Sequence, residues 1–120
     1  MSSILVVIPM YNKAELTNQC IEMVKKNAGI DCDILVVDDG SEIPYENSDP
    51  TIDIHRLDEN SGFTNAVNQG ILYSNYEWEY IHLLNNDTLP EPNFLLKLFE
   101  YMVKEPKLGI ACSTRLLNKD

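Results

Sequence analysis

Positive charge is scarce in this chain of 120 residues, which carries nine lysines and arginines against 19 aspartates and glutamates. The formal net charge of −10 leaves no basic face of the kind that nucleic-acid backbones and anionic membranes require. We therefore expect no nucleic-acid partner. An anionic substrate would need a local device, such as a metal ion, a helix N-terminus or a few placed cations.

Paired cysteines and long hydrophobic runs are also missing. Cys20, Cys32 and Cys112 are widely spaced and form no Cys-x-x-Cys pair. We interpret them as buried apolar residues in a reducing compartment, not as a disulfide framework or a zinc site. The run Ile4–Ile8 is too short for a signal peptide, lacks its basic start, and is far too short to span a bilayer. These absences predict a cytoplasmic location and no membrane span in this chain.

Apolar runs alternate with helix-like patterns along the sequence. Apolar runs rich in Ile, Leu and Val are typical of strands covered on both faces, and strands that contain such runs are expected at Ile4–Ile8, Cys32–Val37 and Trp78–Leu84. Ile52–Leu57 alternates like an edge strand with one face in water, and Leu108–Cys112 is expected to be a fifth strand.

The first helix is expected to follow Pro9, which we expect to end the first strand. Asn12 with Glu15 has the spacing of a capping box. The expected inward positions of this helix are Leu16, Cys20, Met23 and Val24.

Two further helices are expected over Phe63–Ser74 and Phe94–Lys104. Gly70 lies inside the former, where glycine costs about 1 kcal/mol relative to alanine. A close approach of the helix backbone to the sheet would explain this residue.

Strands that alternate with helices predict right-handed βαβ units and a mainly parallel sheet in an α/β fold. The length suits residues 1–120 as a single domain. If the strand order is 3-2-1-4, the ligand crevice lies between the first and fourth strands, where the winding reverses.

Polar clusters follow the first, second and fourth expected strands, at Tyr11-Asn12, Asp38-Asp39 and Asn85-Asn86-Asp87. The carboxyl ends of parallel strands share one edge of the sheet, where open α/β sheets bind ligands. Asp87 can offer oxygen ligands to Mg²⁺ or Mn²⁺, which usually share their coordination with substrate phosphates. Each cluster alone also fits an ordinary turn or helix cap, so their convergence is the stronger signal.

Four short motifs occur in order at Ile8–Asn12, Val37–Ser41, Asn60–Gly70 and Leu83–Thr88. With them the chain resembles the nucleotide-binding, N-terminal half of a family 2 glycosyltransferase with the GT-A fold, a Rossmann-like three-layer sandwich. The Leu-Leu-Asn-Asn-Asp-Thr motif is most similar to a rhamnosyltransferase-type branch. The resemblance implies an inverting transfer of sugar from a UDP- or dTDP-linked donor to the hydroxyl of a glycan, lipid or protein acceptor, assisted by Mg²⁺ or Mn²⁺.

The resemblance also implies roles for particular residues. Tyr11 would stack on a uracil or thymine ring. Asp38 and Asp39 would reach the base edge and the ribose, where a carboxylate can accept from the pyrimidine N3–H. Asp87 would bind the metal. The other donor-binding positions that it implies are Pro9, Asn12, Asn60, Gly62, Asn68, Asn85 and Asn86.

The sequence departs from the family pattern in two ways. Asn85 stands where the first acid of the Asp-x-Asp motif would be, so the metal would meet one charge fewer. Transferases of this family are considerably longer, so the chain is expected to be truncated, with the acceptor site and the catalytic base in the half that it lacks. An inverting displacement needs a general base. Neither histidine fits this role, because His82 lies inside an apolar run and His55 is expected to face solvent.

Other interpretations explain parts of the same pattern. A nucleotide-sugar-binding module without independent activity would share the fold and the donor site. A response-regulator receiver domain has a similar length and alternation, but its acidic pair follows the first strand, and it needs a lysine that is missing here at the end of the last strand. A dinucleotide-binding domain is disfavoured because no Gly-x-Gly-x-x-Gly follows the first strand.

Overall fold

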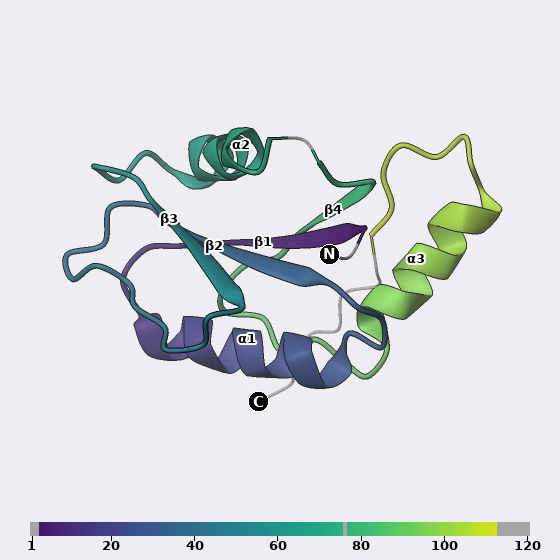
Figure 1. Ribbon diagram of the computed structural model, residues 1–120, viewed down its shortest axis with the longest axis horizontal. Coiled ribbons are helices and arrows are strands. Elements are labelled where there is room, and N and C mark those ends of the chain that lie inside the picture. Colours follow the sequence, from purple (N-terminus) through teal and green to yellow (C-terminus); the bar gives the residue numbers. More distant parts are fainter. Residues whose placement is uncertain (1–2, 76, 113–120) are drawn as a thin grey trace, which may run out of the picture.

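A four-stranded parallel sheet with helices on both faces forms the body of the protein (Figure 1). The computed structural model describes residues 3–75 and 77–112. The strand order is β3-β2-β1-β4, as the sequence predicts. In chain order the elements are β1 (Ile4–Met10), α1 (Ala14–Asn27), β2 (Asp33–Asp38), β3 (Ile52–Arg56), α2 (Phe63–Tyr73), β4 (Tyr80–Leu83) and α3 (Phe94–Lys104).

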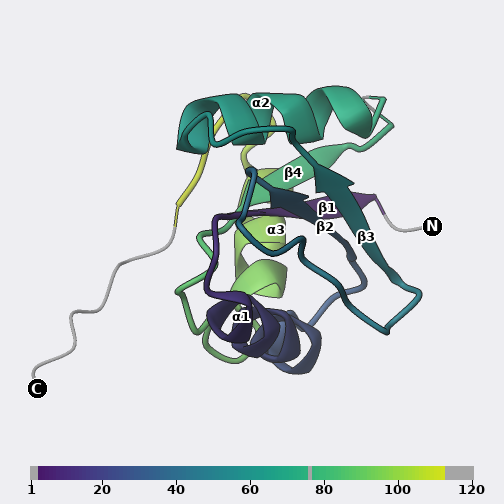
Figure 2. The same ribbon diagram turned by 90° about the vertical axis from the view of Figure 1, so that its left-hand side faces the viewer.

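The elements form three layers, because α2 covers one face of the sheet while α1 and α3 lie on the other (Figures 1 and 2). Alternating residues of the strands feed two separate apolar clusters. On the α1 side the strand residues of the cluster include Ile4, Val6 and Ile8. On the α2 side they include Leu5 and Val7. The continuous apolar sequence of β1 is thus used on both faces.

The first strand is longer than expected, because it continues through Pro9 to Met10. The expectation that Pro9 ends the strand is therefore wrong. Val7 accepts a hydrogen bond from Leu84 on the β4 side, and the residue two further along a strand faces the same edge. The missing N–H of Pro9 thus points to an edge where β4, which ends at Leu83, no longer pairs.

The entry into α1 also differs from the expectation. The helix begins at Ala14, Lys13 is its N-cap with φ 51°, and no side chain caps it. The predicted capping box of Asn12 and Glu15 is wrong, because the Asn12 side chain turns to a different loop, where it accepts from Glu42 N–H at 2.9 Å.

The face that α1 buries is shifted from the one expected. Cys20 and Val24 are buried as predicted, but Leu16 is exposed. Thr17 and Ile21 are buried in addition. The buried face of α1 therefore includes the polar residue Thr17, whose hydroxyl accepts a hydrogen bond from Asn86 in the turn after β4.

Gly70 marks a close approach of α2 to the sheet, as predicted. A Cβ at this position would lie 2.7 Å from Val37 Cγ2 and 3.2 Å from Val7 Cγ1. Only glycine lets the helix axis come this near to β1 and β2.

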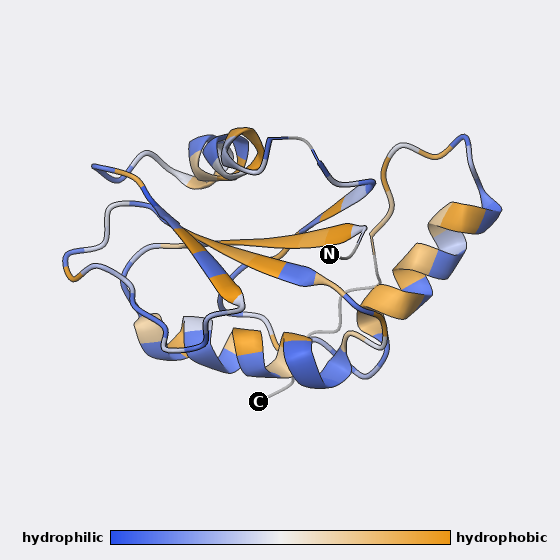
Figure 3. Cartoon of the chain, viewed as in Figure 1, coloured by the Kyte–Doolittle hydropathy of each residue, from blue (hydrophilic) through white to orange (hydrophobic). Residues whose placement is uncertain are grey.

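The far side of β4 is much less covered than the β1–β2 centre. The expected fifth strand is wrong, because Leu108–Cys112 is not a strand and Ile110 is 88 % exposed. Leu95 is the buried residue of α3, although apolar residues extend along much of that helix (Figure 3).

Within the described residues, no helix is long and apolar enough to cross a membrane.

Candidate functional site

The polar turns meet at the carboxyl end of the sheet, as the sequence predicts. Ladder-type hydrogen bonds continue to the last strand residues, since Asp39 N–H donates to Met10 O at 2.8 Å and Leu57 N–H donates to Asp38 O at 2.8 Å. On the other side of β1, Leu84 N–H donates to Val7 O at 3.0 Å. The turns after β1, β2, β3 and β4 therefore start from a fixed edge.

Asp38 ends β2, and its side chain is 0 % exposed. Its Oδ1 accepts from Ser41 N–H at 3.0 Å. Its Oδ2 accepts from Tyr45 N–H at 2.8 Å and from an Arg56 guanidinium N–H at 2.7 Å. The carboxylate thus closes the turn after β2 and pairs with the edge strand.

The environment keeps Asp38 ionised. Burial by itself would raise the pKa of this carboxyl, but the hydrogen bonds from Ser41 and Tyr45 and the Arg56 guanidinium outweigh it, so that the pKa lies below the ordinary value of 3.8. A buried carboxylate with this set of donors has a structural task.

Asp39 connects the turn after β2 to the start of α2. Its Oδ1 accepts from Ser61 N–H at 3.0 Å and from the Ser61 hydroxyl at 2.7 Å, and its Oδ2 accepts from Gly62 N–H at 2.9 Å. Gly40 brings the two turns together, because a Cβ there would lie 2.4 Å from Glu59 C. Gly62 has φ 92° and is the N-cap of α2, which no side chain caps.

The turn after β1 carries an exposed aromatic ring on a constrained backbone. Tyr11 is 44 % exposed. Asn12 and Lys13 both adopt positive φ, at 54° and 51°, a region that residues other than glycine adopt at a cost of about 1 kcal/mol or more. Asn12 N–H donates to Ser41 Oγ at 2.7 Å. The turn after β2 therefore holds the turn after β1.

The turn after β4 lies along α1 and is anchored by polar residues of that helix. Asn86 Nδ2 donates to Thr17 Oγ1 at 3.1 Å, and the Cys20 thiol donates to Asn85 O at 3.6 Å. Further along, Asn27 Nδ2 donates to Pro90 O at 2.8 Å. The backbone of this turn is fixed from beneath, while the side chains of Asn85 and Asp87 are exposed.

Asp87 is the carboxylate of this turn that could contact a metal. Mg²⁺ in nucleotide sites usually takes only one or two carboxylates and completes its shell with phosphates and water. No group of three or more His, Cys, Asp or Glu side chains that could hold a metal occurs in the part of the chain that the structure describes. The donor set therefore fits a metal that arrives with a diphosphate, and not a cage made by protein alone.

The remaining predicted positions differ in accessibility. Pro9 is buried within β1. Asn60 and Asn68 are exposed, the former in the turn before α2 and the latter on that helix.

Neither histidine lies in the polar turns. His55 is on β3 and stacks on Tyr73 with ring centroids 4.3 Å apart, so it is less solvent-facing than expected. His82 is on β4 against Phe94 at 5.6 Å, and burial lowers its pKa. Among the described residues, neither histidine is placed to serve as a general base at the turns.

Sequence reasoning assigned no role to four residues that hold the site together: Arg56, Ser41, Ser61 and Thr17. The contact of Ser41 with Asp38 could have been found, because an aspartate followed by glycine at the end of a strand is typical of a turn in which the carboxylate accepts from a nearby backbone N–H. Arg56 lies directly beside Asp38 in the register of β2 and β3. That register is decided by the folded sheet, so the pair had no signal in the sequence.

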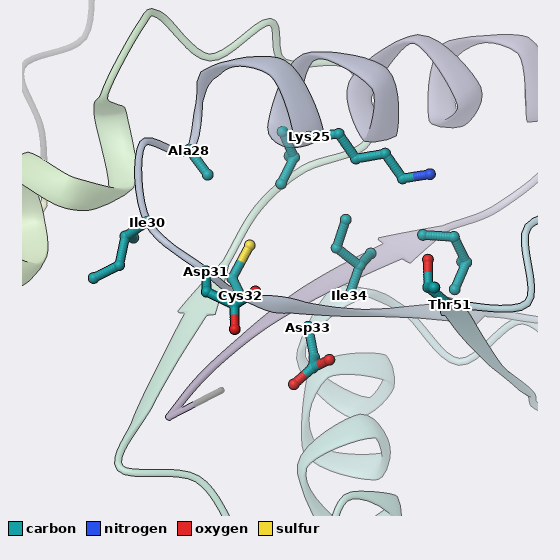
Figure 4. Close-up of a pocket in the computed structure, with 10 residues that line it drawn as sticks. Lys25, Ala28, Ile30, Asp31, Cys32, Asp33, Ile34 and Thr51 are labelled. Atoms are coloured by element: carbon teal, nitrogen blue, oxygen red, sulfur yellow. The ribbon is translucent and has the colours of Figure 1, made fainter. Parts of the chain in front are cut away.

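A cavity of about 220 Å³ lies at the opposite end of the sheet, near the start of β2 and β3 (Figure 4). Its lining mixes apolar residues with charged ones, and its ammonium group, on Lys25, pairs with Asp49. Burial and the carboxylates of Asp31 and Asp33 raise the pKa of Cys32 to about 11. Ligand pockets usually enclose about 300 Å³ or more, so this cavity is a poor candidate for the functional site.

The model of the family described as Glycosyl transferase family 2 matches residues 5–120. The chain therefore belongs to this family. The fold is the GT-A arrangement expected from the sequence, whereas the rhamnosyltransferase-type branch stays a prediction.

Curated relatives are considerably longer than this chain. A poly-beta-1,6-N-acetyl-D-glucosamine synthase of Staphylococcus epidermidis is 29 % identical over 120 residues, which are 94 % of this chain and 29 % of the relative. The glycosyltransferase GlyG of Streptococcus pneumoniae is 29 % identical over 105 residues, which are 79 % of this chain and 33 % of the relative. The chain thus spans about a third or less of these relatives.

Solved structures share the fold. Residues 1–349 of S. aureus TarS superpose with a TM-score of 0.67 at 17 % sequence identity, over 86 % of this chain and 33 % of that one. The complex of the same TarS fragment with UDP superposes with a TM-score of 0.66 at 17 % identity, over 86 % of this chain and 32 % of that one. At this level of identity the likeness concerns the fold.

Proposed function

We propose that residues 1–120 form the donor-nucleotide-binding domain of an inverting glycosyltransferase that uses a UDP- or dTDP-linked sugar. The observation that carries the proposal is the joining of the turns at the carboxyl end of the sheet, where Asp39 bonds the turn after β2 to Ser61 and Gly62. Open α/β sheets bind nucleotides at this edge, next to the strand where the winding reverses, and family membership makes a sugar nucleotide the expected ligand.

In this proposal the base lies against the turns after β1 and β2. Tyr11 offers an exposed ring for stacking on uracil or thymine. Each carboxylate oxygen has about two acceptor positions, and Asp39 Oδ2 uses one of them for Gly62. Asp39 is thus left with a position for a pyrimidine N3–H. Asp38 has no exposed oxygen, so we assign it to holding the turn and not to base contact.

The sugar and diphosphate would extend from there toward α2 and the turn after β4. Asp39 engages the N–H groups of Ser61 and Gly62, but the first turn of α2 that follows has no N-cap side chain and no acidic residue, so its amides can attract a phosphate. This is the local device that a chain of net charge −10 needs for an anionic ligand. Asn60, Gly62, Asn68 and Asn85 would line this part of the site, whereas the Asn86 amide is engaged with Thr17.

Asp87 would hold Mg²⁺ or Mn²⁺ together with the diphosphate. The metal, when bound, neutralises the charge that develops on the departing nucleotide diphosphate. This chain's own contribution is to orient the donor and keep the leaving group near the α2 N-terminus. The general base for the acceptor hydroxyl would be supplied from outside the described residues.

The names of the relatives suggest which donor to test first. Those matched over 94 % of this chain are poly-beta-1,6-N-acetyl-D-glucosamine synthases, so UDP-N-acetylglucosamine is the first candidate sugar nucleotide. A second candidate function is donor binding without transfer by this chain alone. Donor binding alone is favoured for the isolated chain because the chain covers about a third or less of its relatives.

Calorimetric titration with UDP, dTDP and ADP in the presence of Mn²⁺ tests the proposal. We expect UDP or dTDP to bind at least about tenfold more tightly than ADP, because ADP offers no pyrimidine N3–H to Asp39. Tyr11→Ala should weaken the pyrimidine nucleotide about tenfold while the melting temperature stays unchanged, since the ring is exposed. Equal affinity for ADP, or no effect of Tyr11→Ala, would remove the base from this site.

A further inference from the structure

Arg56 reaches from the end of the edge strand β3 to two parts of the neighbouring turn. One guanidinium nitrogen donates to Asp38 Oδ2 at 2.7 Å, and the other donates to Ser41 O at 2.9 Å. A single planar group thus fixes both a carboxylate and a backbone carbonyl three residues further on. Lysine cannot reproduce this, because its ammonium is a point charge without the fork of the guanidinium.

The ion pair is unequal in its exposure, which gives Arg56 its influence. The Asp38 side chain is fully buried, whereas that of Arg56 is 38 % exposed. A buried carboxylate that loses its cation keeps its desolvation cost without compensation. The turn that Asp38 closes, from Ser41 to Tyr45, would therefore rearrange if Arg56 were removed.

The contacts continue from this turn to the turn after β1. Ser41 Oγ accepts from Asn12 N–H at 2.7 Å, and Asn12 Oδ1 accepts from Glu42 N–H at 2.9 Å. Asn12 and Lys13 hold positive φ, and such conformations persist only where the surroundings impose them. The orientation of Tyr11 thus depends on a chain of hydrogen bonds that begins at Arg56.

We infer that Arg56 is a positioning residue of the nucleotide site, acting through Asp38 and Ser41 on the turn Tyr11–Lys13. This inference rests on the proposed function, since it concerns the affinity for a nucleotide. It gives a role to a residue of the edge strand that belongs to none of the four sequence motifs.

The test compares Arg56→Ala and Arg56→Lys with Asp53→Ala, which removes a charge from an exposed position of the same strand. Two quantities are measured in each variant: amide hydrogen exchange in the free protein, and the UDP affinity by calorimetry. In Arg56→Ala we expect exchange at Asn12, Ser41 and Tyr45 to rise about tenfold relative to amides in the centre of β1, and the Kd for UDP to rise about tenfold. Arg56→Lys should lie between, and Asp53→Ala should match the wild type in both.

Ser41→Ala tests the last link should Arg56→Ala fail to fold. It keeps the backbone groups that Asp38 and Arg56 contact and removes the Ser41 hydroxyl, which accepts from Asn12 N–H and donates to Met10 Sδ, so the Kd for UDP should rise several-fold. Unchanged UDP affinity in a folded Arg56→Ala or in Ser41→Ala would overturn the inference while leaving the proposed function intact. A wild-type protein that binds neither UDP nor dTDP would overturn the proposed function, and the inference with it.

Discussion

The turn after β2 and the turn after β4 stand at the same edge of the sheet but are held in different ways. Asp38, Asp39 and Ser41 are buried, and hydrogen bonds connect their side chains to three other segments. Asn85 and Asp87 are exposed, and the backbone of their turn rests on α1. The comparison shows a preformed half, which we assign to the nucleotide, and an open half, which we assign to the metal and diphosphate.

Removal of the Asp38 carboxylate should give the largest effect. Asp38→Ala leaves the buried N–H groups of Ser41 and Tyr45 without an acceptor and removes the ion-pair partner of Arg56. We therefore expect the free energy of unfolding to fall by about 3 kcal/mol. Urea denaturation measures this, with Asp53→Ala as the matched control. A loss under about 1 kcal/mol would mean that the turn after β2 is not held by this carboxylate.

Acid should weaken the preformed half in a way that depends on Asp38. Its folded pKa is below the ordinary value of 3.8, so its contribution to stability is fully present above that value and is lost as the pH falls through the folded pKa. We expect Asp38→Asn to flatten the decline of the unfolding free energy below about pH 4. An equal decline of the unfolding free energy with falling pH in the variant and the wild type would contradict this.

Thr17→Val tests the support of the open half. It keeps the shape of a fully buried residue but removes the acceptor of Asn86 Nδ2, which should cost about 1 kcal/mol of stability. The gain in UDP affinity on adding Mn²⁺ should shrink, whereas the affinity in EDTA should stay as in the wild type. An equal loss of affinity in both conditions would show that the two halves are not separate.

Asp87→Ala should change stability least, by no more than about 0.5 kcal/mol, because the side chain is exposed. The gain in UDP affinity on adding Mn²⁺ should disappear, and the affinity in EDTA should remain. Glu91→Ala removes another exposed acid from the same loop and serves as the control. A metal-dependent gain that survives Asp87→Ala would exclude Asp87 as the ligand.

Sequence reasoning succeeded where one local pattern decides the outcome. The apolar runs in the first 84 residues predicted the four strands of the sheet, and Gly70 predicted the close approach of α2. It failed where distant segments decide. Asn12 has the spacing of a helix cap, yet its side chain bonds Glu42, because Lys13 at positive φ redirects the chain before α1.

The same distinction applies to the candidate site. Its location could be predicted from the ends of the strands, but the different contacts of Asp38 and Asp39 could not. Arg56 lies beside Asp38 only through the register of two parallel strands, and Ser61 faces Asp39 only once α2 has packed. The sequence alone does not show which of two adjacent aspartates will be fully buried when the sheet forms.

A titration of UDP into the wild-type protein, first in EDTA and then with Mn²⁺, tests the central claim most directly. The preformed half predicts measurable binding in EDTA, and the open half predicts tighter binding once the metal is added. The absence of UDP binding in both conditions would contradict the assignment of this edge of the sheet to a donor nucleotide.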